Sequence, residues 1–286
     1  MKILIEPITK KQVYENIDGL ILSLKDFSVQ SINYYTLEEI KEIKNNNPTI
    51  EIFISMNKNF MNEDIEPLEK VLKEIDNLNI NGIFFYDMAV LKIHNDLNLK
   101  TDLVWASTHM VNNYKTCDYY YSKNVKYALL GKEITLEEMI EIINNSKVTS
   151  MVEVIGLPSV AFSKRKLISN FYSDLGKEPK DTITVEEKVT GDNYILNEDK
   201  NGTSFYLDKL VNGTVVLKDL YDNNCPYIII REYGIDKDIF YELVKDTKEY
   251  IDNKCNDEKY IEKYKKLGDF TSFFYKKTIY KVKKNG

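Results

Sequence analysis

The sequence has no long apolar run. No stretch of about 18 apolar residues, the length that a membrane-spanning helix needs, occurs in the 286 residues. The amino terminus reads MKILIEPITKK, and Glu6 interrupts its apolar stretch before it reaches the length of a signal-peptide core. We therefore expect no membrane partner, no export and a cytoplasmic location.

Cysteine and histidine are scarce. The three cysteines, Cys117, Cys225 and Cys255, are odd in number and far apart, which favours free thiols in a reducing compartment over a disulfide framework. The histidines are His94 and His109, and no CxxC pair occurs in the sequence. A structural zinc site needs about four such ligands, so the sequence predicts no metal site.

Basic residues are also fewer than acidic residues. The chain has 45 acidic and 39 basic residues, a net charge of −6, whereas nucleic-acid-binding proteins usually present a basic field. The C-terminal stretch KKTIYKVKK is the one basic candidate, and a short mixed run of this kind is usually a solvated edge. No GxGxxG or GxxxxGK motif is present, which disfavours nucleotide binding by such loops. Nucleic acid is therefore not expected as a partner.

What the sequence does contain is a regular alternation of short apolar runs and amphipathic segments. Thr36 and Thr135, each followed by Glu at capping-box spacing, predict helix starts, as does Thr9 with Gln12 after the first run. Eight strand-then-helix units predict a closed (β/α)8 barrel, because open doubly wound sheets usually have fewer strands and a Gly-rich first turn. The predicted strands cover residues 3–5, 19–23, 50–55, 82–86, 103–106, 126–130, 149–155 and 227–231.

The alternation breaks after the seventh predicted strand. A helix is expected from Ser159 to near Leu175. Residues 182–217 then alternate between polar and apolar, with Asn-Gly turn signals, which is typical of β-hairpins. We predict one α/β domain over residues 1–286, a TIM-barrel-like (β/α)8 fold with a β-hairpin insertion at residues 180–220, between strands 7 and 8.

Polar side chains follow the ends of most predicted strands. The carboxyl ends of barrel strands converge on one mouth where catalytic groups sit, while the opposite face serves stability. Crowded carboxylates near a His and a Lys can do acid–base work, because like charges raise carboxylate pKa values toward neutrality. The predicted catalytic residues are Asp87, His109, Glu133, Glu153 and Glu232, and the predicted ligand-binding residues are Asn57, Ser107, Lys132 and Arg165.

Seven of these side chains are expected to face one shared cavity at the mouth, where a ligand binds. Arg165 joins this set because the seventh strand delivers the following segment over the mouth. The alternative for Asp87 and Glu133 is helix capping, since both stand just before predicted helices. The seven are Asn57, Asp87, His109, Glu133, Glu153, Arg165 and Glu232.

Several ordered blocks resemble the collagenase-like peptidases, peptidase family U32. ISMNKNFMNEDI from Ile54 and ASTHM from Ala106 are similar to strand-end motifs of that family. ALLGKEITLEEMIEI from Ala128 resembles its LARELSLEEI-type segment. GIFFYDMAVLKI from Gly82 and GDFTSFFYKK from Gly268 resemble two further family segments. The resemblance therefore extends over nearly the whole chain.

The family's signature block is similar to EVIGLPSVAFSKRKLISNFY, which begins at Glu153. In the family, a Gly is followed by Cys, then Ser, Arg, a second Cys and Ser-Asn. The resemblance implies ligand-binding roles for Ser169 and Asn170 within this block. The residues of this chain that keep the pattern are Gly156, Ser163, Arg165, Ser169 and Asn170.

The sequence departs from the family at the cysteines. In well-known members, four cysteines in and after the signature block hold an iron–sulfur cluster. Here Ser159 and Lys166 stand at the first two positions, residues 178–188 contain no Cys, and Tyr221 stands near the fourth. None of these side chains replaces a soft thiolate ligand. We therefore expect no cluster and no other cofactor.

The family resemblance implies two activities, peptide-bond hydrolysis and, in cluster-bearing members, oxygen insertion into RNA bases or quinone precursors. Our first interpretation is a peptidase of this family that lacks the cluster and binds a peptide-like or small polar ligand at the barrel mouth. The alternatives are a non-catalytic partner of a cluster-bearing homologue and a protein related to RNA hydroxylation.

Overall fold

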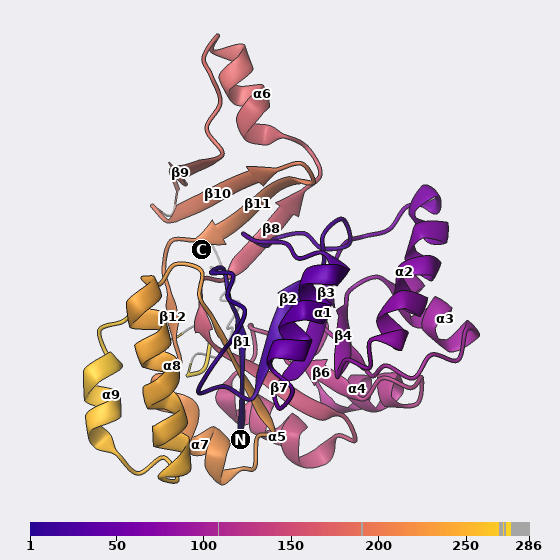
Figure 1. Ribbon diagram of the computed structural model, residues 1–286. Coiled ribbons are helices and arrows are strands. Elements are labelled where there is room, and N and C mark those ends of the chain that lie inside the picture. Colours follow the sequence, from indigo (N-terminus) through magenta and orange to yellow (C-terminus); the bar gives the residue numbers. More distant parts are fainter. Residues whose placement is uncertain (108, 190, 269–270, 272, 276–286) are drawn as a thin grey trace, which may run out of the picture.

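A closed barrel of eight parallel strands forms the body of the chain (Figure 1). The computed structural model describes residues 1–107, 109–189, 191–268, 271 and 273–275; Thr108 and the basic KKTIYKVKK stretch lie outside them. Neighbouring strands pair in chain order from β1 to β7, and β13 pairs with both β7 and β1 to close the barrel, so the expected fold is confirmed. The barrel strands are β1 (Lys2–Glu6), β2 (Gly19–Ser23), β3 (Glu51–Met56), β4 (Gly82–Phe85), β5 (Leu103–Trp105), β6 (Tyr127–Leu129), β7 (Thr149–Gly156) and β13 (Tyr227–Arg231).

Helices lie outside the barrel and cover it with their apolar faces. Thr36 and Thr135 form the two predicted capping boxes, at the starts of α1 and α5. In α2, Leu68 and Leu72 are fully buried, and each such burial contributes about 1.5–3 kcal/mol. The helices are α1 (Leu37–Asn46), η1 (Asn62–Asp64), α2 (Ile65–Asn77), α3 (Met88–Asp96), α4 (Tyr114–Tyr121), α5 (Leu136–Asn145), η2 (Thr214–Val216), α7 (Leu217–Asp222), α8 (Lys237–Asp252) and α9 (Glu258–Tyr264).

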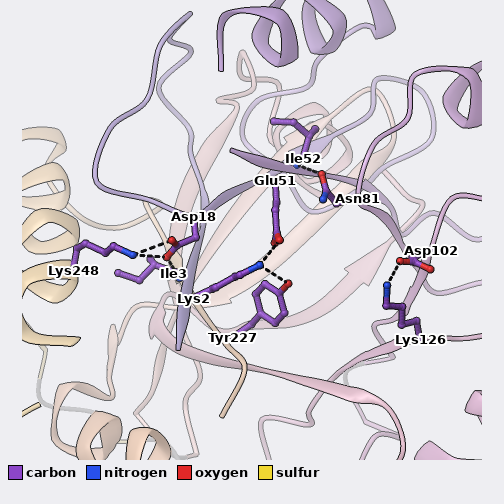
Figure 2. Close-up of polar contacts among 10 residues, drawn as sticks. All are labelled: Lys2, Ile3, Asp18, Glu51, Ile52, Asn81, Asp102, Lys126, Tyr227 and Lys248. Carbon is purple, nitrogen blue, oxygen red and sulfur yellow. Dashed lines mark hydrogen bonds and ion pairs between the residues drawn. The ribbon is translucent and has the colours of Figure 1, made fainter. Parts of the chain in front are cut away.

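Apolar side chains from the strands fill the barrel, and polar contacts close its amino-terminal end. Phe53 meets Tyr127 and Tyr227 edge-on, with ring centroids 5.9 and 6.3 Å apart. Below these rings, Lys2 pairs with Glu51 and donates to the Tyr227 hydroxyl at 3.4 Å (Figure 2). The barrel is thus packed rather than open, and a ligand site is expected at the opposite end of the strands.

The connection between β1 and β2 differs from the prediction. Residues 7–18, all of them described by the structure, contain no helix. Instead, the backbone amides of Ile8 and Thr9 donate to Oε2 of Glu232 at 2.7 and 2.8 Å, and the Thr9 hydroxyl donates to Oε1 at 2.5 Å. The helix expected after Thr9 is therefore wrong, because a buried carboxylate from the end of β13 takes the amides that a helix start leaves free.

A four-stranded antiparallel sheet is inserted after β7 and stands over the mouth end of the barrel (Figure 1). Its strand order is β8-β11-β10-β9, which confirms the predicted hairpins. Gly202 makes the tight β10–β11 turn at φ +141, where an added Cβ would lie 2.1 Å from the Ser163 carbonyl oxygen. The insertion contains β8 (Ser159–Ser163), α6 (Leu167–Asp174), β9 (Thr182–Glu186), β10 (Asn193–Asp199) and β11 (Gly202–Leu207).

Two local predictions around the insertion are wrong. The helix expected from Ser159 begins only at Leu167, because residues 159–163 pair with β11 as β8. After β11, β12 (Val211–Asn212) pairs with β7, and the expected strand near Leu217 is the start of α7. Pairing with the distant strand β11 overrode the local helical pattern at residues 159–163. At Leu217, packing of α7 against the barrel overrode the alternating pattern.

No helix in the part of the chain that the structure describes is long and apolar enough to cross a membrane.

Candidate functional site

A cavity of about 640 Å³ opens at the mouth of the barrel, between the carboxyl ends of β3, β4 and β5 and the inserted strand β8. This volume lies in the range of about 300–1,000 Å³ that is usual for small-ligand sites. Its lining is mixed, with amides and lysines beside apolar side chains. The lining residues are Val29, Gln30, Asn57, Lys58, Asn59, Met61, Glu63, Asp64, Tyr86, Ala106, His109, Ser159, Val160, Ala161, Phe162, Lys164 and Asn201.

Amide side chains hold the loops around this cavity. Asn57, just past β3, accepts a hydrogen bond on Oδ1 from the Val29 amide at 2.9 Å. Gln30 has a left-handed backbone, with φ +57, and its side-chain amide donates to the Ser159 hydroxyl and, at 3.2 Å, to the Ala161 carbonyl. The loop after β2 therefore connects the barrel to the insertion at the cavity.

Beside the cavity, four charged residues form a chain of ion pairs across the mouth. Arg231, at the end of β13, pairs with Glu6 and, at 2.6 Å, with Glu153. Lys132 pairs with the other oxygen of Glu153 at 2.7 Å. Burial lowers the pKa of Arg231 to about 10, so the guanidinium remains charged at neutral pH. Glu153, whose side chain is 6% exposed, is held between two cations.

His109 is the predicted catalytic residue that reaches the cavity. Its Nδ1 lies 3.3 Å from Oε1 of Glu133, and both side chains are more than half exposed. A carboxylate beside an imidazole can orient the ring. The pair is the arrangement at this mouth that most resembles an acid–base dyad.

Asp87 and Glu232 have structural partners instead. Asp87 accepts hydrogen bonds from the amides of Ala89 and Phe60, both at 2.9 Å, and caps α3. Glu232 is 1% exposed and holds the β1–β2 loop, as described above. The capping alternative for Asp87 is confirmed.

The shared cavity predicted for seven side chains is wrong. Asn57 and His109 line it, whereas Asp87, Glu133, Glu153, Arg165 and Glu232 do not. The strand ends do converge, but ion pairs and caps turn most of these side chains toward protein partners. The proposed catalytic roles of the individual residues stay predictions.

The remaining predicted ligand-binding residues also lie outside the cavity. Ser107 is buried, and Lys132 belongs to the ion-pair chain. Ser169 binds Glu198 through its hydroxyl and backbone amide, which stabilises the start of α6. Arg165 and Asn170 are exposed on the insertion.

Sequence reasoning missed several lining residues, Gln30, Tyr86 and Lys164 among them. Tyr86 is the last residue of the predicted fourth strand and directly follows β4, so its position at a strand end was a readable signal. Gln30 and Lys164 gave none, because the loop conformation and the strand pairing that place them depend on distant segments.

The cysteines do not supply a nucleophile or a cluster site. Cys117, Cys225 and Cys255 are buried, and they lie in α4, before β13 and after α8. Burial raises the pKa of Cys117 and Cys225 to about 12 and that of Cys255 to about 11, which keeps the thiols protonated at neutral pH. Among the described residues, no three His, Cys, Asp or Glu side chains are grouped so that they could hold a metal ion. These residues do not fit the iron–sulfur cluster of cluster-bearing relatives.

An eight-stranded barrel with a polar cavity at the strand ends defines the architecture, and the family follows from the sequence match. The model of peptidase family U32 matches residues 8–267, so the chain belongs to this family.

Curated relatives carry two kinds of name. The "tRNA hydroxylation protein P2" of Bacillus subtilis is 24% identical over 249 residues, 80% of this chain and 81% of the relative. An "uncharacterized protease" of Methanocaldococcus jannaschii is 27% identical over 165 residues, 54% of this chain and 39% of the relative. The two names thus point to different activities.

Solved structures are similar only at a distance. A U32 peptidase structure aligns with a TM-score of 0.46 and 13% identity over 55% of this chain and 69% of its own. The spore cortex-lytic enzyme SleL of Bacillus megaterium aligns with a TM-score of 0.40 and 11% identity over 86% and 73%.

Proposed function

We propose that this chain is a non-catalytic partner of a cluster-bearing member of its family in a tRNA-hydroxylating system, and that its mouth cavity holds a peptide-like or small polar ligand. The name of the B. subtilis relative, aligned over four-fifths of both chains, supports the pathway. The net charge of −6 supports a partner role, because a chain of this charge is poorly suited to bind the tRNA backbone by itself.

The observation that carries the proposal is that carboxylates at the barrel mouth are already bound to protein partners. Glu153 is held by Arg231 and Lys132, and Asp87 caps a helix. The cavity beside them is lined largely by amides, lysines and apolar side chains, and His109 is the one predicted catalytic residue among its lining residues. A site of this composition fits recognition better than chemistry.

Deletion of the gene in its host tests the pathway. We expect the level of hydroxylated tRNA nucleosides, measured by mass spectrometry of digested tRNA, to fall well below that of the wild-type strain. The wild-type gene should restore them, and tagged protein should co-purify with a cluster-bearing homologue. Unchanged hydroxylation in the deletion strain would rule the proposal out.

One observation favours the second candidate, a peptidase. His109 and Glu133 form a carboxylate–imidazole pair at the cavity. If this pair does peptidase chemistry, purified protein will hydrolyse casein or gelatin, and His109→Ala will abolish that hydrolysis while Lys123→Gln, an exposed change near α4, will not. If the chain is a non-catalytic partner, neither the wild-type protein nor the His109→Ala variant will hydrolyse casein or gelatin.

A further inference from the structure

The cavity lies against the edge of a β-strand. Successive residues of a strand point to opposite faces of its sheet, so a cavity on one face touches alternate residues. This cavity is lined by four consecutive residues of β8, from Ser159 to Phe162. In the part of the chain that the structure describes, β8 has one strand neighbour, β11, which lies on its other side. The open side of β8 therefore faces the cavity.

A side-chain amide already occupies part of this edge. The Gln30 side chain donates to the Ala161 carbonyl at 3.2 Å, as the backbone amide of a neighbouring strand would. Gln30 also donates to the Ser159 hydroxyl at the start of β8. The open edge of β8 thus presents a main-chain acceptor, the Ala161 carbonyl, toward the cavity. The loop residue Gln30 donates to this carbonyl where an added strand would donate instead.

The charge along β8 favours an acidic partner. Lys164, just past the end of β8, lines the cavity and is exposed. Its ammonium donates to the Asn59 carbonyl at 3.5 Å. The pKa of Asp64 is lowered mainly by a hydrogen bond from the Met61 amide, and the Lys164 charge is near enough to help lower it, but no carboxylate of a described residue lies within ion-pair distance of Lys164. Lys58, across the cavity, is paired with Asp64 at 2.9 Å. Lys164 is therefore the cation at this site that an incoming carboxylate can pair with.

We infer that the cavity binds an extended peptide segment of a partner protein, which adds as a strand to the open edge of β8 and places an acidic side chain at Lys164. Strand addition takes its affinity from main-chain hydrogen bonds and its specificity from side-chain pockets. Val160, 39% exposed, and Tyr86, 38% exposed, provide the apolar contacts for alternate side chains of the segment. The inference rests on the proposed partner role and names the surface that performs it.

The test uses phage-displayed random octapeptides selected on the immobilised full chain. The best binder is synthesised with a fluorescent label and measured by anisotropy in three forms: unmodified, and N-methylated at either of the two alternate sets of backbone amides. Strand addition uses the amides of one set only. We expect one methylated form to bind at least about tenfold more weakly, and the other to bind within about threefold of the unmodified peptide.

Matched variants test the charge. We expect the selected peptides to contain Asp or Glu, and Lys164→Gln to weaken binding about fivefold, more at low salt than at high salt. Lys180→Gln, an exposed change in the same insertion but away from the cavity, should leave binding unchanged. On binding, the amides of β8 should exchange hydrogen more slowly, because strand addition protects them.

Four results would overturn the inference: no selected binder, equal binding of both methylated forms, equal effects of the two lysine variants, or binding of oligouridylate where the peptides fail. The tRNA assay separates this failure from that of the proposed function. Loss of hydroxylation on gene deletion without peptide binding would contradict only the strand-addition site. Peptide binding with unchanged hydroxylation would contradict only the pathway.

Discussion

At the scale of single residues, Arg231 links two carboxylates that the barrel mouth brings together. Glu6 is the last residue of β1 and Glu153 lies within β7, on either side of β13, and their side chains are 15% and 6% exposed. Without the guanidinium, two poorly hydrated carboxylates would face each other. Breaking a buried pair in this way is destabilising, because Glu6 loses this cation and Glu153 keeps only its pair with Lys132.

We therefore expect Arg231→Gln to lower the free energy of unfolding by about 2–4 kcal/mol, somewhat less than for a fully buried pair. Urea denaturation followed by circular dichroism measures this change. The control is Lys92→Gln, which breaks the exposed pair with Asp96 and should change stability by less than about 0.5 kcal/mol. Equal effects of the two changes would show that the mouth network contributes no more than a surface pair.

The buried thiols predict a loss of stability at alkaline pH. Their pKa values are raised in the folded protein, to about 12 for Cys117 and Cys225, while the unfolded chain releases these protons near the ordinary value of about 9. The stabilising contribution is therefore complete below pH 9 and is lost as the pH rises toward 12. We expect the urea midpoint to fall over that interval.

Alkylation by iodoacetamide separates this effect from general alkaline denaturation. At pH 8 the native thiols should react far more slowly than those of the urea-unfolded chain, because the thiolate is the nucleophile and burial also blocks access. Rapid alkylation of native protein at pH 8 would contradict the burial of the cysteines. Cys117→Ser and Cys225→Ser variants would identify the thiol responsible for the alkaline loss of stability.

At the scale of elements, the insertion begins and ends at one place on the barrel. Ser159 and Tyr206 are paired across β8 and β11, so their backbones lie close together, about 5 Å apart. Deletion of residues 197–210 alone would remove β11, which pairs with both β8 and β10. A deletion that removes the whole four-stranded sheet leaves no strand of the insertion without its partner.

We expect the barrel to survive replacement of residues 160–205 by a short Gly/Ser linker. The eight barrel strands pair with one another, so their hydrogen bonds do not depend on the insertion. Calorimetry should show a single cooperative transition for the shortened chain, and the selected octapeptide should no longer bind. Loss of cooperative melting would mean that the insertion is part of the folding unit.

At the scale of the whole molecule, the chain keeps the barrel of its family while its thiols are dispersed. Three buried cysteines on separate elements do not form the four-thiolate set that a cluster needs. We expect protein purified without oxygen to be colourless, with no absorption near 400 nm characteristic of iron–sulfur charge transfer, and with far less than stoichiometric iron and sulfide. A brown preparation with stoichiometric iron would contradict this expectation.

Much of the barrel could be predicted because its signals are local. Each strand is a short apolar run, and the Thr36 and Thr135 capping boxes mark helix starts within four residues of sequence. Such signals depend on burial and on backbone amides close in the chain. The predictions for the β1–β2 loop and for β8 were wrong for the opposite reason, since the residues with which they pair, Glu232 and those of β11, lie 40 or more positions away.

The sequence by itself determined the alternation of strands and helices, the membership of a peptidase family and the lack of a four-cysteine set. Only the tertiary structure decided which polar side chains at the strand ends are free. The strands β1, β7 and β13 bring Glu6, Glu153 and Arg231 within ion-pair distance. These charges therefore pair with one another rather than with a ligand. The position of the cavity was likewise decided in three dimensions, because β8 reaches the mouth only by pairing with a strand some 40 residues later in the chain.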